Sequence, residues 1–167
     1  MPSKYIVGEV IVKPKELIFD YNKFYRIIYG FMKELGYFVK EIEYHHNTKG
    51  STVNVGFYWD CIRDVDDYSR FQIELFVDFP ALETINVIKG RTKQTTNKGS
   101  GNIKIRATLL TDYDAKWEQN AIFNFFKTIF EDHFYKSSVN KYLEELGKEM
   151  YEIENEIKSY FQMQKFM

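Results

Sequence analysis

The chain has 167 residues, of which 44% are hydrophobic, 18% aromatic and 28% charged, and its formal net charge is −1. This composition excludes a disordered chain, and the length predicts one domain over residues 1–167. The balanced charge excludes a general attraction to nucleic acid or membranes, and the N-terminal stretch lacks the apolar run of a signal peptide. With Cys61 as the only cysteine, we expect a cytoplasmic protein without disulfides or membrane contact.

The N-terminal part of the sequence predicts a strand and then a helix. Residues 4–13 are β-branched and apolar and end before a proline, as in a strand. Apolar positions then step by three and four up to Leu35, with Asp20 as the N-cap and Gly36 after the last turn. A helix that begins one turn earlier, at Leu17, fits the sequence equally well.

The middle of the sequence predicts five strands in hairpin-like succession. The alternation of apolar and polar residues is strongest in the third of them, where we expect Pro80 to end the strand. The last two strands flank a stretch rich in Gly, Thr, Lys and Asn, which predicts a second hairpin. The five strands cover residues 37–46, 53–61, 71–79, 83–89 and 101–111.

The C-terminal part predicts two helices, one over residues 117–134 and one that opens at Ser137 or Ser138. The last helix has apolar residues at alternating spacings of four and three, which is a heptad pattern. This seam either covers the protein's own sheet, or residues 138–165 protrude and pair with a second copy in a homodimer. Its members are Val139, Leu143, Leu146, Met150, Ile153, Ile157 and Tyr160.

The order of elements predicts an α+β fold, with an antiparallel sheet of about six strands, one N-terminal helix and two C-terminal helices. Over residues 4–160 this order resembles the helix-grip fold of START and Bet v 1-like proteins. That resemblance implies an apolar ligand between the sheet and the C-terminal helices. The composition and the pair Lys116-Trp117 are also similar to uncharacterised archaeal proteins, a family without an assigned activity.

The sharpest local feature is a basic stretch over residues 89–106, which carries six cations and no acidic residue. With Gly90, Gly99 and Gly101 it predicts a flexible hairpin tip that could bind phosphates of RNA or a ribonucleoprotein. The alternative is a solvated hairpin whose charges protect a sheet edge. The six cations are Lys89, Arg91, Lys93, Lys98, Lys104 and Arg106.

No motif in the sequence selects a catalytic residue, a metal site or a cofactor. The acidic residues between 60 and 67 lack the spacing of an EF-hand, and adjacent His45 and His46 point to opposite sides of a strand. Cys61 alternates with polar neighbours, so we expect it to point inward, where a thiolate is disfavoured. The sequence therefore favours a non-enzymatic protein that binds an anionic partner. The alternatives are a carrier of an apolar ligand and an enzyme of unknown reaction.

Overall fold

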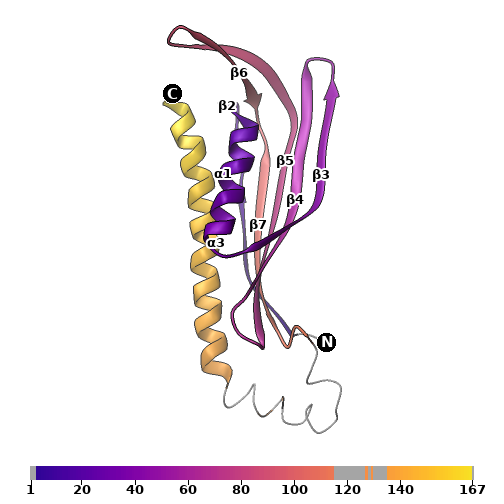
Figure 1. Ribbon diagram of the computed structural model, residues 1–167, viewed down its shortest axis with the longest axis vertical. Coiled ribbons are helices and arrows are strands. Elements are labelled where there is room, and N and C mark those ends of the chain that lie inside the picture. The colour runs from indigo at the N-terminus through magenta and orange to yellow at the C-terminus, as the bar shows by residue number, and fades with distance from the viewer. Residues whose placement is uncertain (1–2, 115–126, 128, 130–134, 167) are drawn as a thin grey trace.

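The computed structural model describes residues 3–114, 127, 129 and 135–166. In these residues one antiparallel sheet of seven strands carries two helices on one face (Figure 1). The sheet has the order β1-β7-β5-β4-β3, and β6 pairs with both β5 and β2. The strands are β1 (Ser3–Val12), β2 (Leu17–Phe19), β3 (Phe38–Lys49), β4 (Thr52–Asp64), β5 (Ser69–Lys89), β6 (Thr92–Gly99) and β7 (Asn102–Thr111), and the helices are α1 (Tyr21–Glu34) and α3 (Lys136–Lys165).

The predicted fold class is wrong in two of its details. The sheet has seven strands instead of about six, and the described part of the chain holds two helices instead of three. The helix expected over residues 117–134 lies outside the described residues, except for Lys127 and Ile129. The coarser prediction, an α+β protein with an antiparallel sheet, is confirmed.

Two errors in the strand prediction have local physical reasons. Residues 17–19 form β2 because they pair with β6, so α1 begins after Asp20, whose side chain accepts the Lys23 backbone N–H at 3.0 Å. Residues 92–99 form β6, although their side chains show no apolar alternation, because they pair with β5 through the backbone. Backbone pairing of this kind leaves no hydrophobic pattern in the sequence.

Pro80 does not end a strand, since β5 continues for 21 residues from Ser69 to Lys89. The proline lies where β5 changes its neighbour, because pairing with β7 stops at Asp78 and pairing with β6 starts at Glu83. The register with β4 also shifts at this place. A residue without a backbone N–H is tolerated at such an irregularity.

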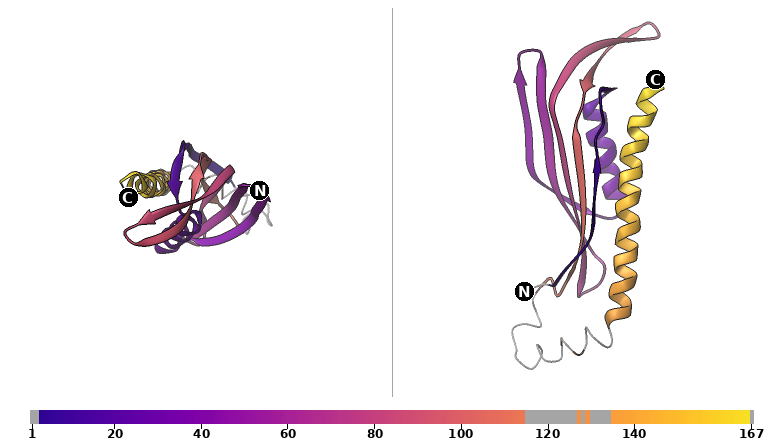
Figure 2. Two further views of the ribbon diagram at one scale, coloured as in Figure 1. Left: turned by 90° about the horizontal axis from the view of Figure 1, so that it is seen from above. Right: turned by 180° about the vertical axis from the view of Figure 1, so that it is seen from behind.

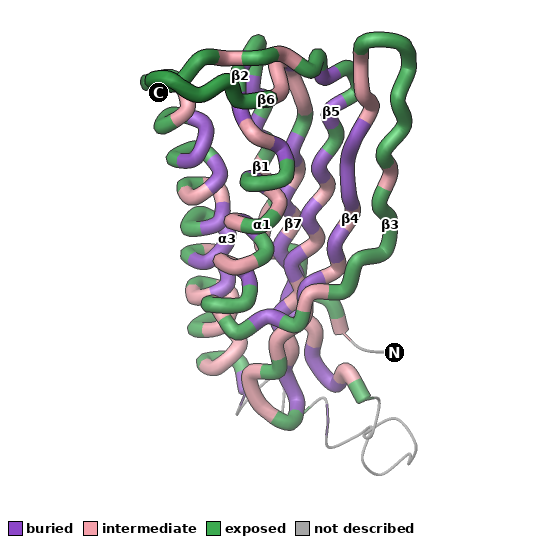
Figure 3. Tube along the Cα trace, turned by 45° about the horizontal axis from the view of Figure 1, so that its top comes forward, coloured by how far each residue is buried: buried purple, intermediate pink, exposed green. Residues whose placement is uncertain are grey.

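The hydrophobic core lies between the inner face of the sheet and the two helices. Figure 2 shows α3 running along the length of the sheet, and in Figure 3 buried positions alternate with less buried ones along the central strands. Helix α1 buries Tyr21, Phe24, Ile28 and Met32. The opposite face of the sheet has no helix over it in the described part of the chain.

The heptad seam of α3 packs on the protein's own sheet. Val139 and Leu143, at its start, are partly buried against the core. The other five members are buried, with exposed fractions of 3% or less. Of the two arrangements left open by the sequence, the structure therefore shows the one in which the seam covers the sheet. The buried members are Leu146, Met150, Ile153, Ile157 and Tyr160.

Candidate functional site

The fold separates the six basic residues of the 89–106 stretch. Beyond the places where β5 stops pairing with β4 and β6 stops pairing with β2, these two strands continue as a two-stranded ribbon, residues 84–96, which we call the arm. The arm carries Lys89, Arg91 and Lys93 around its turn, and Lys98 lies at its base. Figures 1 and 2 show that the arm bends over the end of the molecule at which α3 finishes.

Lys104 and Arg106 lie elsewhere, on the outer face of β7. The Lys104 Nζ atom lies 4.8 Å from the centroid of the Phe76 ring. Arg106 is paired with two carboxylates, Glu9 at 2.9 Å and Glu74 at 3.7 Å. The charge of Arg106 is therefore already neutralised by ion pairs within the protein. Lys104 and Arg106 do not lie beside the cations of the arm.

Of the three glycines expected at a flexible tip, only Gly90 lies in the turn, where its φ is 62°. A Cβ atom on Gly99 would lie 2.8 Å from the Leu82 side chain, and one on Gly101 would collide with the Phe79 ring. These two glycines allow close packing at the base of the arm. The prediction that they make a tip flexible is wrong.

A recess of about 480 Å³ lies under the arm. Its walls come from β2, the first turn of α1, the arm and the end of α3, which are far apart in the sequence and meet at this end of the molecule. We call it the arm recess. It is lined by Ile18, Asp20, Lys23, Val87, Ile88, Lys89, Gln94, Thr95, Thr96, Gln164 and Lys165.

Three cations from three different elements line the arm recess. They are Lys23 from α1, Lys89 from the arm and Lys165 from α3, and none forms an ion pair with any residue that the structure describes. The single carboxylate in the wall, that of Asp20, is the N-cap of α1. The recess is therefore a cationic space whose one acidic group is engaged by the backbone.

Two polar contacts fix the elements around the arm recess. The Tyr21 backbone N–H donates to Asn97 Oδ1 at 3.3 Å, which ties the start of α1 to the base of the arm. The Glu16 backbone N–H donates to Ser100 Oγ at 2.9 Å, which ties the connection before β2 to the connection after β6. The base of the arm is thereby held while its turn projects.

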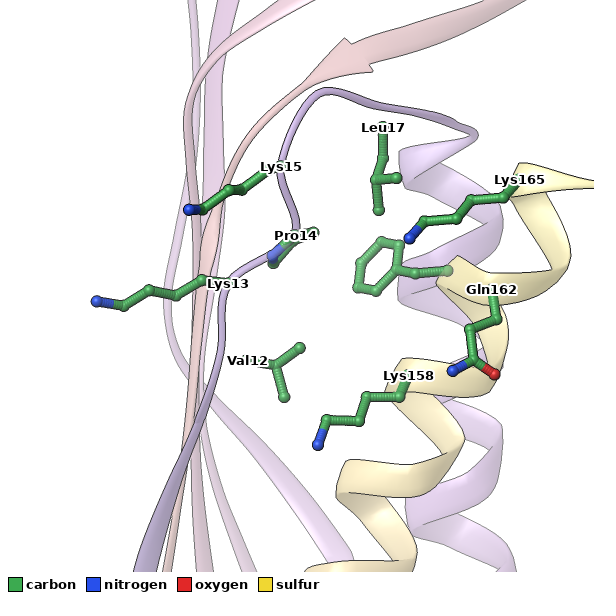
Figure 4. A pocket seen from close by; sticks show the side chains of 9 residues that line it. Val12, Lys13, Pro14, Lys15, Leu17, Lys158, Gln162 and Lys165 are labelled. Atoms are coloured by element: carbon green, nitrogen blue, oxygen red, sulfur yellow. The ribbon is translucent and has the colours of Figure 1, made fainter.

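A second recess, of about 400 Å³, lies between the β1–β2 connection and α3, and we call it the slot (Figure 4). Lys158 and Lys165 point toward the space between strand and helix, whereas Lys13 and Lys15 point away from it. Lys158 Nζ is paired with Glu154 at 2.6 Å. Lys165 lines both this slot and the arm recess. The slot is lined by Val12, Lys13, Pro14, Lys15, Leu17, Lys158, Phe161, Gln162 and Lys165.

The acidic turn between β4 and β5 lies at the opposite end of the molecule. The carboxylate of Asp66 in this turn is held by hydrogen bonds. Asp66 accepts the backbone N–H groups of Tyr68 and Ser69 and the hydroxyls of Tyr135 and Tyr142, at 2.6–3.0 Å. Burial would raise the pKa of Asp66, but these hydrogen bonds outweigh it and lower the pKa. This carboxylate holds the turn together and offers no free acid or base.

The cysteine and the two adjacent histidines are also placed unfavourably for catalysis or metal binding. Cys61 is fully buried, and burial, followed by the charge of Asp60, raises its pKa to about 12. His45 lies 3.4 Å from Asp78 on the outer face, and His46 belongs to the other face of β3. In the described ranges, no three His, Cys, Asp or Glu side chains are grouped so that they could hold a metal ion.

Comparisons with models of protein families, with curated proteins and with solved structures returned no match for this chain. Neither helix of the described part is long and apolar enough to cross a membrane.

The middle of the gap in which an apolar ligand was expected is filled by the protein's own side chains. Trp59, Phe24, Phe71 and Phe79 are fully buried between the sheet and the helices. Phe161 of α3 stacks on Phe24 with ring centroids 5.2 Å apart. Three of the recesses in the described residues lie at the basic end or beside the base of the arm, and a fourth, of about 370 Å³, lies between β1, β7 and the first turns of α3.

Sequence reasoning missed two of the three cations of the arm recess. Lys23 and Lys165 lie far from the 89–106 stretch in the sequence, in the first turn of α1 and the last turn of α3. Single lysines at helix ends are common, and no pattern in the sequence joins them to the arm. Only the arrangement of α1 and α3 under the arm shows that they belong to one site.

Proposed function

We propose that the protein is a non-enzymatic binding protein that holds RNA, alone or in a ribonucleoprotein, by its phosphates at the basic end. Lys23, Lys89 and Lys165 contact the phosphates in the arm recess, and Arg91 and Lys93 extend the contact along the arm. The proposal places the protein in the cytoplasm. The observation that carries it is that one recess is lined by three lysines, none of which forms an ion pair with another described residue.

The distribution of charge over the molecule supports this proposal. Three aspartates, Asp64, Asp66 and Asp67, lie in or beside the turn between β4 and β5, far from the arm (Figure 1). A net charge of −1 therefore conceals a local group of cations around the arm recess. A local field of this kind attracts and orients a polyanion although the whole molecule is nearly neutral.

The arm favours contacts with phosphates over contacts with bases. Residues 84–96 contain no aromatic side chain, so the arm offers no platform on which bases could stack. Binding by phosphate contacts releases counterions and weakens as salt is added, with a log–log slope of about −0.7 for each phosphate neutralised on a single strand. We expect a steep dependence on salt and little preference for sequence.

The experiment is fluorescence anisotropy with a labelled single-stranded RNA of mixed sequence, titrated between about 50 mM and 200 mM salt. The parent protein is expected to bind at low salt, and the double variant Lys89→Glu/Lys165→Glu to lose this binding. Both positions are exposed, so the fold should be retained, and circular dichroism checks this.

A matched double variant, Lys40→Glu/Lys104→Glu, makes the same change of charge away from the basic end. Both residues belong to the outer-face positions of β3 and β7. It should keep most of the RNA affinity. If it weakens binding as much as the variant at the recess, or if the parent binds no RNA at low salt, the proposed function is wrong.

A further inference from the structure

The arm recess has the chemistry of a pocket for one phosphate group. Its lining supplies the ammonium groups of Lys23, Lys89 and Lys165 and the side-chain amides of Gln94 and Gln164. The recess is thus rich in positive charge and in hydrogen-bond donors, whereas its single carboxylate is the N-cap of α1. A terminal phosphate carries a charge of about −1.5 to −2 at neutral pH and three acceptor oxygens. A terminal phosphate therefore matches the charge and the hydrogen-bond donors of this lining better than an internal phosphodiester, which carries a single charge.

The size and shape of the recess favour a chain end over a passing strand. Its volume of about 480 Å³ is in the range of sites for single small ligands, about 300–1,000 Å³. The three lysines line the recess from three elements, α1, the arm and α3, instead of following one another along a single element. An internal phosphate would bring a nucleotide on both of its sides into this space.

The same recess offers an apolar surface beside its cations. Ile88 of the arm is 80% exposed and Ile18 of β2 is 44% exposed, and both contribute to the lining together with Val87. Aliphatic side chains at these positions can cover the face of one base or ribose while the lysines hold the phosphate. The lining therefore matches a nucleotide and not an isolated inorganic ion.

We propose that the arm recess binds the terminal nucleotide of an RNA strand through its phosphomonoester. This inference rests on the proposed function, because it assigns the recess to the end of the RNA and the rest of the arm to the phosphates that follow. A 5′ and a 3′ terminal phosphate share this chemistry, and the experiment distinguishes them.

The test compares three RNAs of one sequence, carrying a 5′ phosphate, a 3′ phosphate or hydroxyls at both ends, by fluorescence anisotropy at a fixed salt concentration. One phosphorylated RNA is expected to bind about tenfold more tightly than the hydroxyl-ended RNA, as one strong charge-assisted contact gives. The matching nucleoside monophosphate should compete with it. Equal affinity for all three RNAs overturns this inference but leaves the proposed function standing, whereas no binding of any RNA overturns both.

Two single variants separate the recess from the arm. Lys165→Gln removes a cation of the recess and should abolish the preference for the phosphorylated end. Lys93→Gln removes an arm cation that does not line the recess, and it should weaken all three RNAs by the same factor. If Lys165→Gln leaves the preference unchanged, or if Lys93→Gln removes it, the terminal phosphate does not lie in the arm recess.

Discussion

The Tyr37 hydroxyl donates a hydrogen bond to the Glu149 carboxylate at 2.6 Å, and the two residues are 112 positions apart in the sequence. Glu149 also accepts from the Arg63 guanidinium at 2.6 Å, and Arg63 in turn donates to the Leu35 carbonyl at 2.6 Å. Burial, and then the hydrogen bond to Glu149, raise the pKa of Tyr37. This buried network joins α3 to β4 and to the end of α1.

Replacing Glu149 with alanine should destabilise the protein strongly, because it leaves the Arg63 charge without its closest partner. We expect a loss of about 3 kcal/mol in the free energy of unfolding, measured by urea denaturation. Tyr37→Phe removes one hydrogen bond and leaves the ion pair, so it should cost only about 1 kcal/mol. Equal losses in the two variants would show that the ion pair contributes nothing beyond the hydroxyl.

The seam of α3 should behave as part of the monomer's core. Ile153 is fully buried, so Ile153→Ala should lower the free energy of unfolding by about 2–5 kcal/mol. Tyr151, two residues earlier, is 55% exposed, and Tyr151→Ala should change it by less than about 0.5 kcal/mol. Unfolding that depends on protein concentration would instead show that a second copy contributes to the seam.

Two glycine substitutions should have opposite effects on stability. A Cβ at Gly101 would collide with the Phe79 ring and the Asp78 carbonyl, so Gly101→Ala should cost about 1–3 kcal/mol. Gly30 lies inside α1 with open space around it, so Gly30→Ala should stabilise the fold by about 0.5–1 kcal/mol. Thermal unfolding of both variants measures these effects. A harmless Gly101→Ala would mean that the base of the arm is loosely packed.

The Cys61 thiol should make stability fall at alkaline pH. Its pKa is raised by burial from 9.0 to about 12, so the folded state keeps the neutral thiol while the unfolded chain ionises. The stabilisation is complete below about pH 9 and is lost as the pH rises toward about 12. Between about pH 8 and pH 10 the parent should lose roughly 1 kcal/mol more than Cys61→Ala.

Urea denaturation at the two pH values gives this difference, and buried tyrosines, which are common to both proteins, cancel from it. The same burial predicts that thiol reagents label Cys61 slowly in the folded protein and rapidly in urea. Fast labelling without denaturant would contradict the inward position of this residue.

Elements with one buried face could be predicted from the sequence. The alternation in residues 53–61 and 71–79 identified β4 and the first part of β5, because inner-face residues such as Trp59 and Leu75 are fully buried. The N-cap Asp20 also marked the start of α1. The likeness to the helix-grip fold stays a prediction, since no solved structure matched the chain.

The strand β6 and the partition of the basic stretch could not be predicted in this way. Strand β6 is polar on both faces, so only its backbone pairing with β5 reveals it. The partners of Arg106, Glu9 and Glu74, are brought to it by β1 and β5, which are distant in the sequence. A count of charges along the chain therefore includes cations that the fold has already neutralised.

The change of neighbour at Pro80 divides β5 into two parts that should open independently. From Arg70 to Asp78 it is paired on both sides, with β4 and β7, whereas from Thr84 to Lys89 it pairs with β6 alone. A two-stranded ribbon is marginally stable in water. Backbone amides of the arm should therefore exchange with deuterium through local opening, and those of the lower part only through global unfolding. Under the proposed function, this local opening lets the arm release or admit RNA while the rest of the sheet stays intact.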